Sequence, residues 1–202
     1  MTTTKKLTIA VVALAVALVC VVSGTLAFLV AQSNTVTNTF TYGKIELELA
    51  EEEKTNTTGM EFTNVIPGDV LPKDPVVTVK ADSEKCYVYV LITNELGNAA
   101  TYNINTDTST DNYWIEVLET GDSILYRYNK VVDATSTAVY CAVFTELTFA
   151  TDLDKDAVAG LAGKDVIIQA YAHQAENLGN APITVADGAA KTWMTNAIPT
   201  TD

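Results

Sequence analysis

The segment Ile45-Glu46-Leu47-Glu48-Leu49 alternates strictly between apolar and acidic residues. Successive side chains of a β-strand point to opposite faces, so this pattern predicts a strand with one buried and one solvated face. An amphipathic helix would instead repeat its apolar residues with a period of 3.6. The period of two therefore indicates a β fold.

Further segments rich in β-branched and aromatic residues follow, and Cys86-Tyr87-Val88-Tyr89-Val90-Leu91-Ile92 has the strongest strand character. Tyr87 and Tyr89 share one face of this strand, where packing against another layer is the default expectation. Strands are predicted at residues 45–49, 76–80, 86–92, 113–118, 124–128, 138–149 and 165–171. Turn-forming residues separate them at 67–69, 94–98, 121–122 and 163–164. The spacing predicts an all-β jelly roll or sandwich of about eight strands.

Two segments depart from this pattern and predict one or two short helices. Residues 152–161 are helix-like and carry acidic side chains at their start, where these suit the helix dipole. The tail at 183–197 is rich in alanine and predicts a second helix. The polar stretches 51–59 and 103–112 lack apolar periodicity and are predicted to be surface loops.

The N-terminus has the three parts of a secretory signal peptide. Lys5 and Lys6 precede an apolar run at 7–22, and small residues lead up to Ala27. Cleavage is expected after Ala27, so the mature chain would begin at Phe28. The predicted organisation is a signal peptide at 1–27, an N-terminal strand segment at 28–40 and one domain at 41–202. An uncleaved membrane anchor is the alternative, since the segment extended to Ala31 is long enough to span a bilayer, for which about 20 apolar residues suffice.

The chain is acidic, with 12 basic and 25 acidic residues and a formal net charge of −13. Loss of Lys5 and Lys6 would make the charge two units more negative. This balance argues against binding to nucleic acid or to anionic lipid, which both demand clustered basic residues. We therefore expect no nucleic-acid partner, and membrane contact only through the uncleaved signal helix.

Two cysteines remain after the signal peptide, Cys86 and Cys141, and each lies in an apolar strand-like run. An even pair in an exported chain is typical of a disulfide. Two buried thiols that never meet are the alternative, and the residues alone leave both open.

Residues that could carry catalysis are few. The chain has one histidine, His173, whereas zinc proteases need two histidines one helical turn apart and a glutamate base. No Gly-x-Ser-x-Gly motif accompanies it. We therefore assign no catalytic, cofactor-binding or metal-binding residues, and we expect no enzyme and no cofactor.

An acidic run at Asp152, Asp154 and Asp156 superficially matches a calcium loop. Such a loop needs glycine at its sixth position and glutamate at its twelfth, where this chain has Ala157 and Gly163. A solvated helix start is favoured, although cation binding at the three aspartates stays open. The run at 51–53 is similarly expected to be a solvated loop.

Cleavage would leave Phe28, Leu29, Val30 and Ala31 as a free apolar end. Such a segment can pair within its own domain or complete the sheet edge of a neighbouring copy. The second arrangement is head-to-tail and produces a filament. Physical arguments alone do not decide between pairing within the domain and pairing with a neighbouring copy.

The sequences Gly24-Thr25-Leu26-Ala27-Phe28 and Val36-Thr37-Asn38-Thr39-Phe40-Thr41-Tyr42-Gly43-Lys44-Ile45 resemble the start of the TasA/camelysin family of Gram-positive bacteria. The resemblance continues through Val65-Ile66-Pro67-Gly68-Asp69, the strands at 73–79 and 86–90, and the late strand at 167–176. It weakens in the middle of the chain and in the tail from Pro182. The cysteine pair is also not associated with the fibre-forming members.

The resemblance implies a secreted jelly-roll protein whose signal peptide is cut by the dedicated signal peptidase SipW. It further implies self-assembly into extracellular fibres of the biofilm matrix at the cell surface, with Phe28, Leu29, Val30 and Ala31 acting as a donor strand. The expected partners are therefore other copies of the chain and the signal peptidase. A cell-surface hydrolase or protease, and a monomeric surface binding module, are the alternatives.

Overall fold

The computed structural model describes residues 43–51, 62 and 64–198, which belong to one compact unit beginning at Tyr42. Within these residues the chain forms ten strands, a short 3-10 helix η1 (Gly97–Ala99) and two α-helices. The expected all-β sandwich with one or two helices is confirmed. Among the described residues, no helix is long and apolar enough to cross a membrane.

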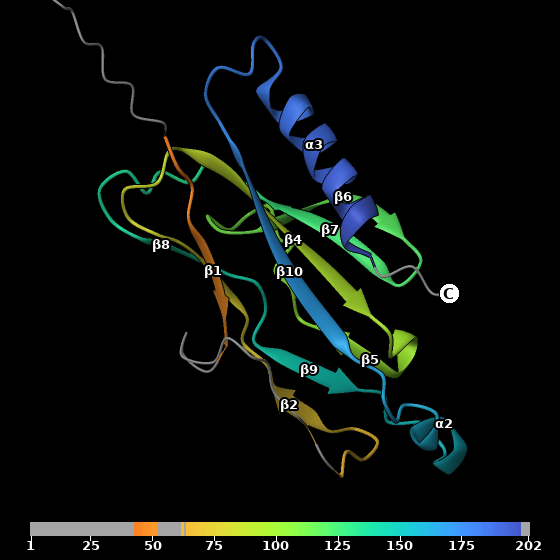
Figure 1. Ribbon diagram of the computed structural model, residues 1–202. Helices are drawn as coiled ribbons and strands as arrows, with labels where there is room; N and C mark the ends of the chain where they lie inside the picture. The colour runs from red at the N-terminus through yellow and green to blue at the C-terminus, as the bar shows by residue number, and fades with distance from the viewer. Residues whose placement is uncertain (1–42, 52–61, 63, 199–202) are drawn as a thin grey trace, which may run out of the picture. The chain divides into compact units, whose positions relative to one another are not determined.

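All strand pairs are antiparallel and form three sheets (Figure 1). The four-stranded sheet has the order β10-β4-β7-β6, and two three-stranded sheets have the orders β1-β3-β8 and β2-β9-β5. The two smaller sheets are connected twice by the chain, because β2 leads into β3 and β8 leads into β9. The strands are β1 (Leu47–Ala50), β2 (Val70–Pro72), β3 (Val76–Val79), β4 (Cys86–Asn94), β5 (Ala100–Tyr102), β6 (Trp114–Thr120), β7 (Ser123–Tyr128), β8 (Val139–Ala142), β9 (Glu146–Phe149) and β10 (Val166–Gln174).

The central strand is β4, which is buried on both faces. Its even-numbered residues, such as Val88 and Val90, lie in a core cluster with Val77 of β3 and Cys141 of β8. This cluster joins the two layers of the sandwich. A fully buried apolar side chain contributes about 1.5–3 kcal/mol, so this shared core is the main source of stability.

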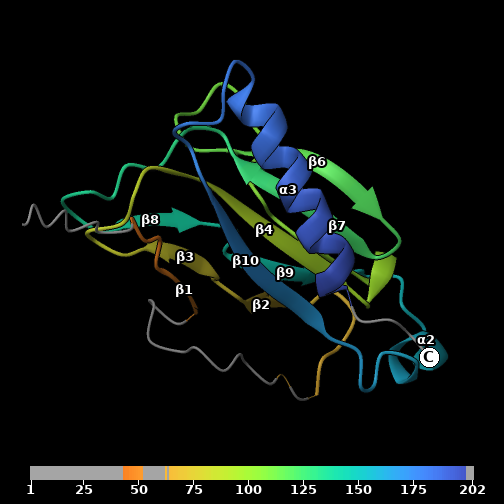
Figure 2. The ribbon, with the colours of Figure 1, turned by 45° about the horizontal axis from the view of Figure 1, so that its top comes forward.

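The opposite face of β4 is covered by α3 (Pro182–Ala197), which lies across the four-stranded sheet (Figure 2). Tyr87, Tyr89 and Leu91 form a second cluster with the helix residues Ala186, Ala190 and Met194. The helix residues are spaced four apart, so they form one apolar stripe. The expected helix in the tail and the expected packing role of Tyr87 and Tyr89 are confirmed.

The predicted single strand at 138–149 is wrong, because the structure divides it into β8 and β9. The Asn103 side-chain oxygen accepts hydrogen bonds from the backbone N–H groups of Thr145 (2.9 Å) and Glu146 (3.1 Å). Both N–H groups are therefore bonded to the Asn103 side chain at the point where the chain passes from β8, which pairs with β3, to β9, which pairs with β2. The three-residue strands β2 and β5 were missed, since so short a segment carries no periodicity.

The other predicted elements match with shifted ends. The turn at Gly121 connects β6 to β7, and its φ of 58° lies in the left-handed region that glycine tolerates. Residues 103–112 form no strand or helix, as expected. The helix predicted at 152–161 is the shorter α2 (Lys155–Ala159).

Candidate functional site

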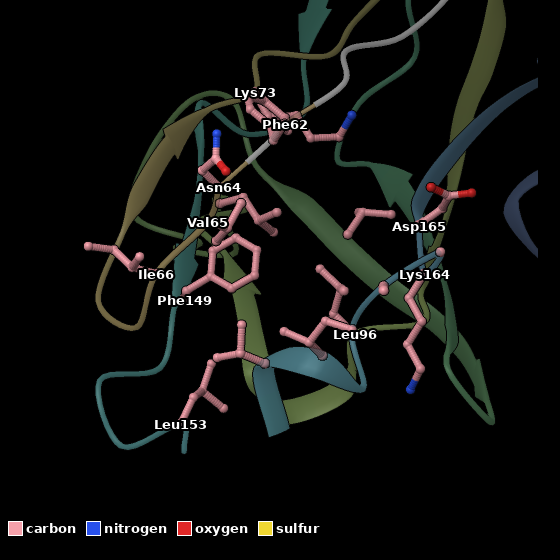
Figure 3. A pocket seen from close by; sticks show the side chains of 16 residues that line it. Phe62, Asn64, Val65, Ile66, Lys73, Leu96, Phe149, Leu153, Lys164 and Asp165 are labelled. Atoms are coloured by element: carbon pink, nitrogen blue, oxygen red, sulfur yellow. The ribbon is translucent and has the colours of Figure 1, made fainter. Parts of the chain in front are cut away.

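A hollow of about 620 Å³ lies between β9 and the segment that leads from α2 into β10 (Figure 3). The residues that line it come from chain segments far apart in the sequence, and most of these residues are apolar. The apolar lining includes Val65, Ile66, Leu147, Phe149, Leu153 and Leu161. Several of these belong to the small core cluster around Phe149, so the hollow adjoins that end of the sandwich core.

The polar residues of the hollow are few: Asn64, Lys73, Lys164 and Asp165. In Figure 3 the side chain of Lys164 extends away from the labelled apolar residues. A concave surface that combines apolar side chains with a few polar side chains is typical of a binding site. No sequence pattern pointed to this site, because its residues are brought together only by the fold.

A buried ion pair borders the hollow. Lys73 Nζ lies 2.6 Å from Glu51 Oε1, and each side chain is only 8% exposed. The second carboxylate oxygen, Glu51 Oε2, is buried without a hydrogen-bond partner. The expectation of a solvated loop was therefore wrong for Glu51, because Glu51 pairs with Lys73, which directly follows β2, and is buried. Glu52 and Glu53 lie outside the described residues.

A second polar cluster attaches α3 to the sheet. Tyr89 donates a hydrogen bond to Asp187 (2.8 Å), and Arg127 Nε lies 3.0 Å from the same carboxylate oxygen. The Arg127 Nε–H makes no hydrogen bond, so Arg127 and Asp187 interact as an ion pair without one at this nitrogen. Burial, followed by the hydrogen bond to Asp187, raises the pKa of Tyr89. The cluster fixes the helix in place on the sheet.

Cys86 and Cys141 are both fully buried members of the core cluster between the sheets. In the structure they are free thiols. Burial raises the pKa of Cys86 to about 11, and burial together with Cys86 raises that of Cys141 to about 12. The folded thiols are therefore protonated and unreactive near neutral pH. A disulfide in exported protein stays a prediction.

We expect mass spectrometry of the exported chain, unfolded in the presence of an alkylating agent and without reductant, to show Cys86 and Cys141 unlabelled and joined. The two residues lie on facing sheets, and closing a loop of roughly 50–60 residues stabilises a protein by about 4 kcal/mol in the chain-entropy model. The reduced protein serves as the control and should accept label on both residues. Two labelled thiols in unreduced material would end the disulfide hypothesis.

The remaining candidates have structural roles. His173 lies on β10, and its Nδ1 is 2.9 Å from the carbonyl oxygen of Gln174. Asp154 caps α2 by accepting a hydrogen bond from the Ala157 N–H (2.8 Å). This agrees with the helix start that the sequence favoured at the acidic run. Within the described part of the chain, no group of three His, Cys, Asp or Glu residues could hold a metal ion.

The predicted cleavage site at Ala27 and Phe28 lies outside the described residues, as do the predicted donor-strand residues Phe28, Leu29, Val30 and Ala31. Their roles stay predictions.

In its described residues, this protein is an antiparallel β-sandwich with a helix on the outer face of one sheet. The chain belongs to the camelysin metallo-endopeptidase family, whose model matches residues 2–113. The predicted resemblance to the TasA/camelysin family is thus confirmed. None of the curated proteins compared with this sequence matches it.

Among solved structures, the chain is similar to the non-cellulosomal cohesin from the hyperthermophilic archaeon Archaeoglobus fulgidus. The identity is 9%, the TM-score is 0.30, and the match covers 54% of this chain and 70% of the cohesin.

The family description implies a metal ion, and the donors of this chain fit one poorly. The sequence holds a single histidine. His173 Nδ1 lies against the backbone carbonyl oxygen of Gln174. A catalytic zinc site usually takes two or three histidine ligands, so we derive no reaction step through a metal.

Proposed function

We propose that this chain is a secreted structural protein, a subunit or accessory component of extracellular biofilm matrix fibres, whose copies join head to tail by strand donation. The observation that carries the proposal is the free apolar end, Phe28 to Ala31, that cleavage after Ala27 would create. Membership of the TasA/camelysin family supports it. SipW would be the processing enzyme, and the cell surface of a Gram-positive bacterium the destination.

The charge of the chain adds a condition to assembly. Copies with a formal charge of −13 or beyond repel one another at low ionic strength. At about 0.15 M salt the Debye length is about 8 Å, so this repulsion is largely screened. Filament growth should therefore be faster at physiological salt than at low salt.

Purified mature chain beginning at Phe28 is expected to form filaments visible by electron microscopy. Replacing Phe28, Leu29 and Val30 together by serine should abolish them, because the apolar segment that a neighbour would bury is lost. The matched control replaces the polar residues Gln32 and Asn34 by serine and should still assemble. A mature wild-type chain that stays monomeric across concentration, pH and salt would overturn the proposal.

The family description favours a second candidate, a cell-surface metallo-endopeptidase. The single histidine and its backbone contact weigh against it. Casein cleavage by the mature chain, with and without added zinc, separates the two candidates. Cleavage that chelation abolishes and that His173→Ala removes would establish the peptidase.

A further inference from the structure

We propose that α3 is a releasable cover, which acid detaches from the four-stranded sheet before the sandwich unfolds, because protonation of Asp187 leaves Arg127 buried without a counter-charge. The inference does not depend on the proposed fibre function, since it concerns the described domain alone. It gives the polar cluster beneath α3 a second role: the contacts that hold the helix at neutral pH release it in acid.

Arg127 lies within the surface that α3 covers. It is opposite Tyr89 in the sheet register, and Tyr89 is in turn opposite Tyr171 on β10. Residues opposite one another on paired strands share a face. Tyr89 belongs to the cluster that packs against α3, so this is the outer face of the sheet. Because the Arg127 side chain is only 9% exposed, its charge is buried between the sheet and the helix.

The charge of Arg127 depends on a carboxylate that acid removes. Among the described residues, its ion-pair partner is Asp187, with 3.0 Å between Nε and Oδ1. Arginine stays charged at any pH at which proteins fold, whereas aspartate side chains take up a proton below about pH 4. Loss of one member of a buried ion pair leaves an uncompensated buried charge, which is strongly destabilising. Separation of α3 from the sheet relieves this by admitting water to Arg127.

Other ionisable groups near the helix cannot replace the Asp187 carboxylate. In the described domain, those that α3 carries or that β4 and β10 present beneath it are Tyr87, Tyr89, Tyr171, His173 and Lys191. The tyrosines stay neutral in acid, and the histidine and the lysine can only be neutral or cationic. None of these side chains can therefore supply a negative charge to Arg127.

The adjacent strand β6 supplies no counter-charge to the outer face either. Glu116 lies opposite Tyr126, and Glu119 lies opposite Ile124. Tyr126 belongs to the core cluster between the sheets, and Ile124 packs against it. Since opposite residues share a face, both glutamates face away from α3.

α3 depends on the sheet for its own stability. It has no side-chain N-cap, no acidic residue in its first turn and no basic residue in its last turn. Gly188 lies near its middle, where glycine weakens a helix. Its fully buried side chains are Ala186, Ala190 and Met194, two of which are small. The core cluster between the sheets is larger, so we expect the sandwich to outlast the docked helix.

The direction of the pH effect follows from linkage. The ion pair stabilises the docked helix while Asp187 is ionised, and this contribution is lost as the pH falls and the carboxylate takes up a proton. Docking is therefore strongest near neutral pH and weakest in acid. Release uncovers an apolar surface, because Tyr89, Leu91 and Leu125 are fully buried beneath the helix.

Hydrogen exchange of the full mature chain tests the release. Mass spectrometry would follow peptides from α3 and from β4, with rates corrected for the intrinsic effect of pH. Between pH 7 and pH 3 we expect the α3 amides to lose about tenfold more protection than the β4 amides, or more. The β4 peptides are the reference because acid also protonates Glu51, whose pair with Lys73 lies beside β1 and β2. Equal losses would mean that the whole domain opens, and the proposal would fall.

Two variants separate the charge from the packing. Asp187→Asn keeps an acceptor for the Tyr89 hydroxyl and removes the charge, so α3 should lose protection by about tenfold or more already at pH 7. Arg127→Met combined with Asp187→Asn removes both charges, so α3 should regain its protection and lose its pH dependence. The proposal is overturned if α3 stays protected in Asp187→Asn, or if the double variant still releases α3 in acid.

His173→Gln is the matched control on β10. Histidine also changes its charge between pH 7 and pH 3, and His173 lies on the same face as Tyr171. Since it is not paired with Arg127, its replacement should leave the release of α3 unchanged. If the variant loses the pH dependence, His173 and not Asp187 is the trigger, and the proposal is wrong.

Discussion

Lys73→Met is expected to lower the free energy of unfolding by about 3–5 kcal/mol, because it leaves the buried Glu51 carboxylate without its partner. The carboxylate is already incompletely paired. Glu51 Oε2 has no hydrogen-bond partner, and only Oε1 is paired, with Lys73 Nζ at 2.6 Å. Removal of Lys73 would leave both oxygens buried and unsatisfied. Urea unfolding followed by circular dichroism measures the change.

Two controls separate loss of the ion pair from loss of packing. The double variant Lys73→Met with Glu51→Leu removes both charges and should recover most of the stability, since apolar replacements of buried pairs are often neutral or stabilising. Lys80→Met breaks the exposed pair with Glu48 and should change little. If Lys73→Met proves as mild as Lys80→Met, the pair is not buried in solution.

Trp114→Ala is expected to cost about 3–5 kcal/mol, the usual range for removing a large buried aromatic side chain. Trp114 is 2% exposed, and its ring contacts Tyr128 edge-on, with 5.1 Å between centroids. Its indole N–H also donates to the carbonyl oxygen of Ala142 on β8, at 2.8 Å. One side chain on β6 thus joins the two facing sheets.

Trp193→Ala is the matched control, because it makes the same change on the outer face. Trp193 is only half-buried on α3 and stacks on Tyr171, with 5.1 Å between ring centroids. Its loss should cost about 1–2 kcal/mol. Thermal and urea unfolding of both variants measure the difference. Similar losses would mean that α3 is as important to stability as the contact between the sheets.

The hollow could not be predicted from the sequence, and the reason is physical. Its lining comes from residues around Val65, from β9 and from α2, and no local pattern links these segments. The ion pair was missed for a similar reason. Glu51 begins a run of three glutamates, which is typical of a solvated loop, and only the register that places Ala50 opposite Val76 brings it to Lys73.

The sequence by itself determined the β class, the central position of β4 and the helix in the tail. The run from Cys86 to Ile92 is apolar at every position, so both faces of this strand had to be covered, whatever covered them. Local periodicity carries that information because it depends only on neighbouring residues. Tertiary structure alone decided that α3 covers one face and β3 with β8 the other. It also decided that residues around Val65, on β9 and on α2 come together to line the hollow, because these features arise from pairing between segments distant in the chain.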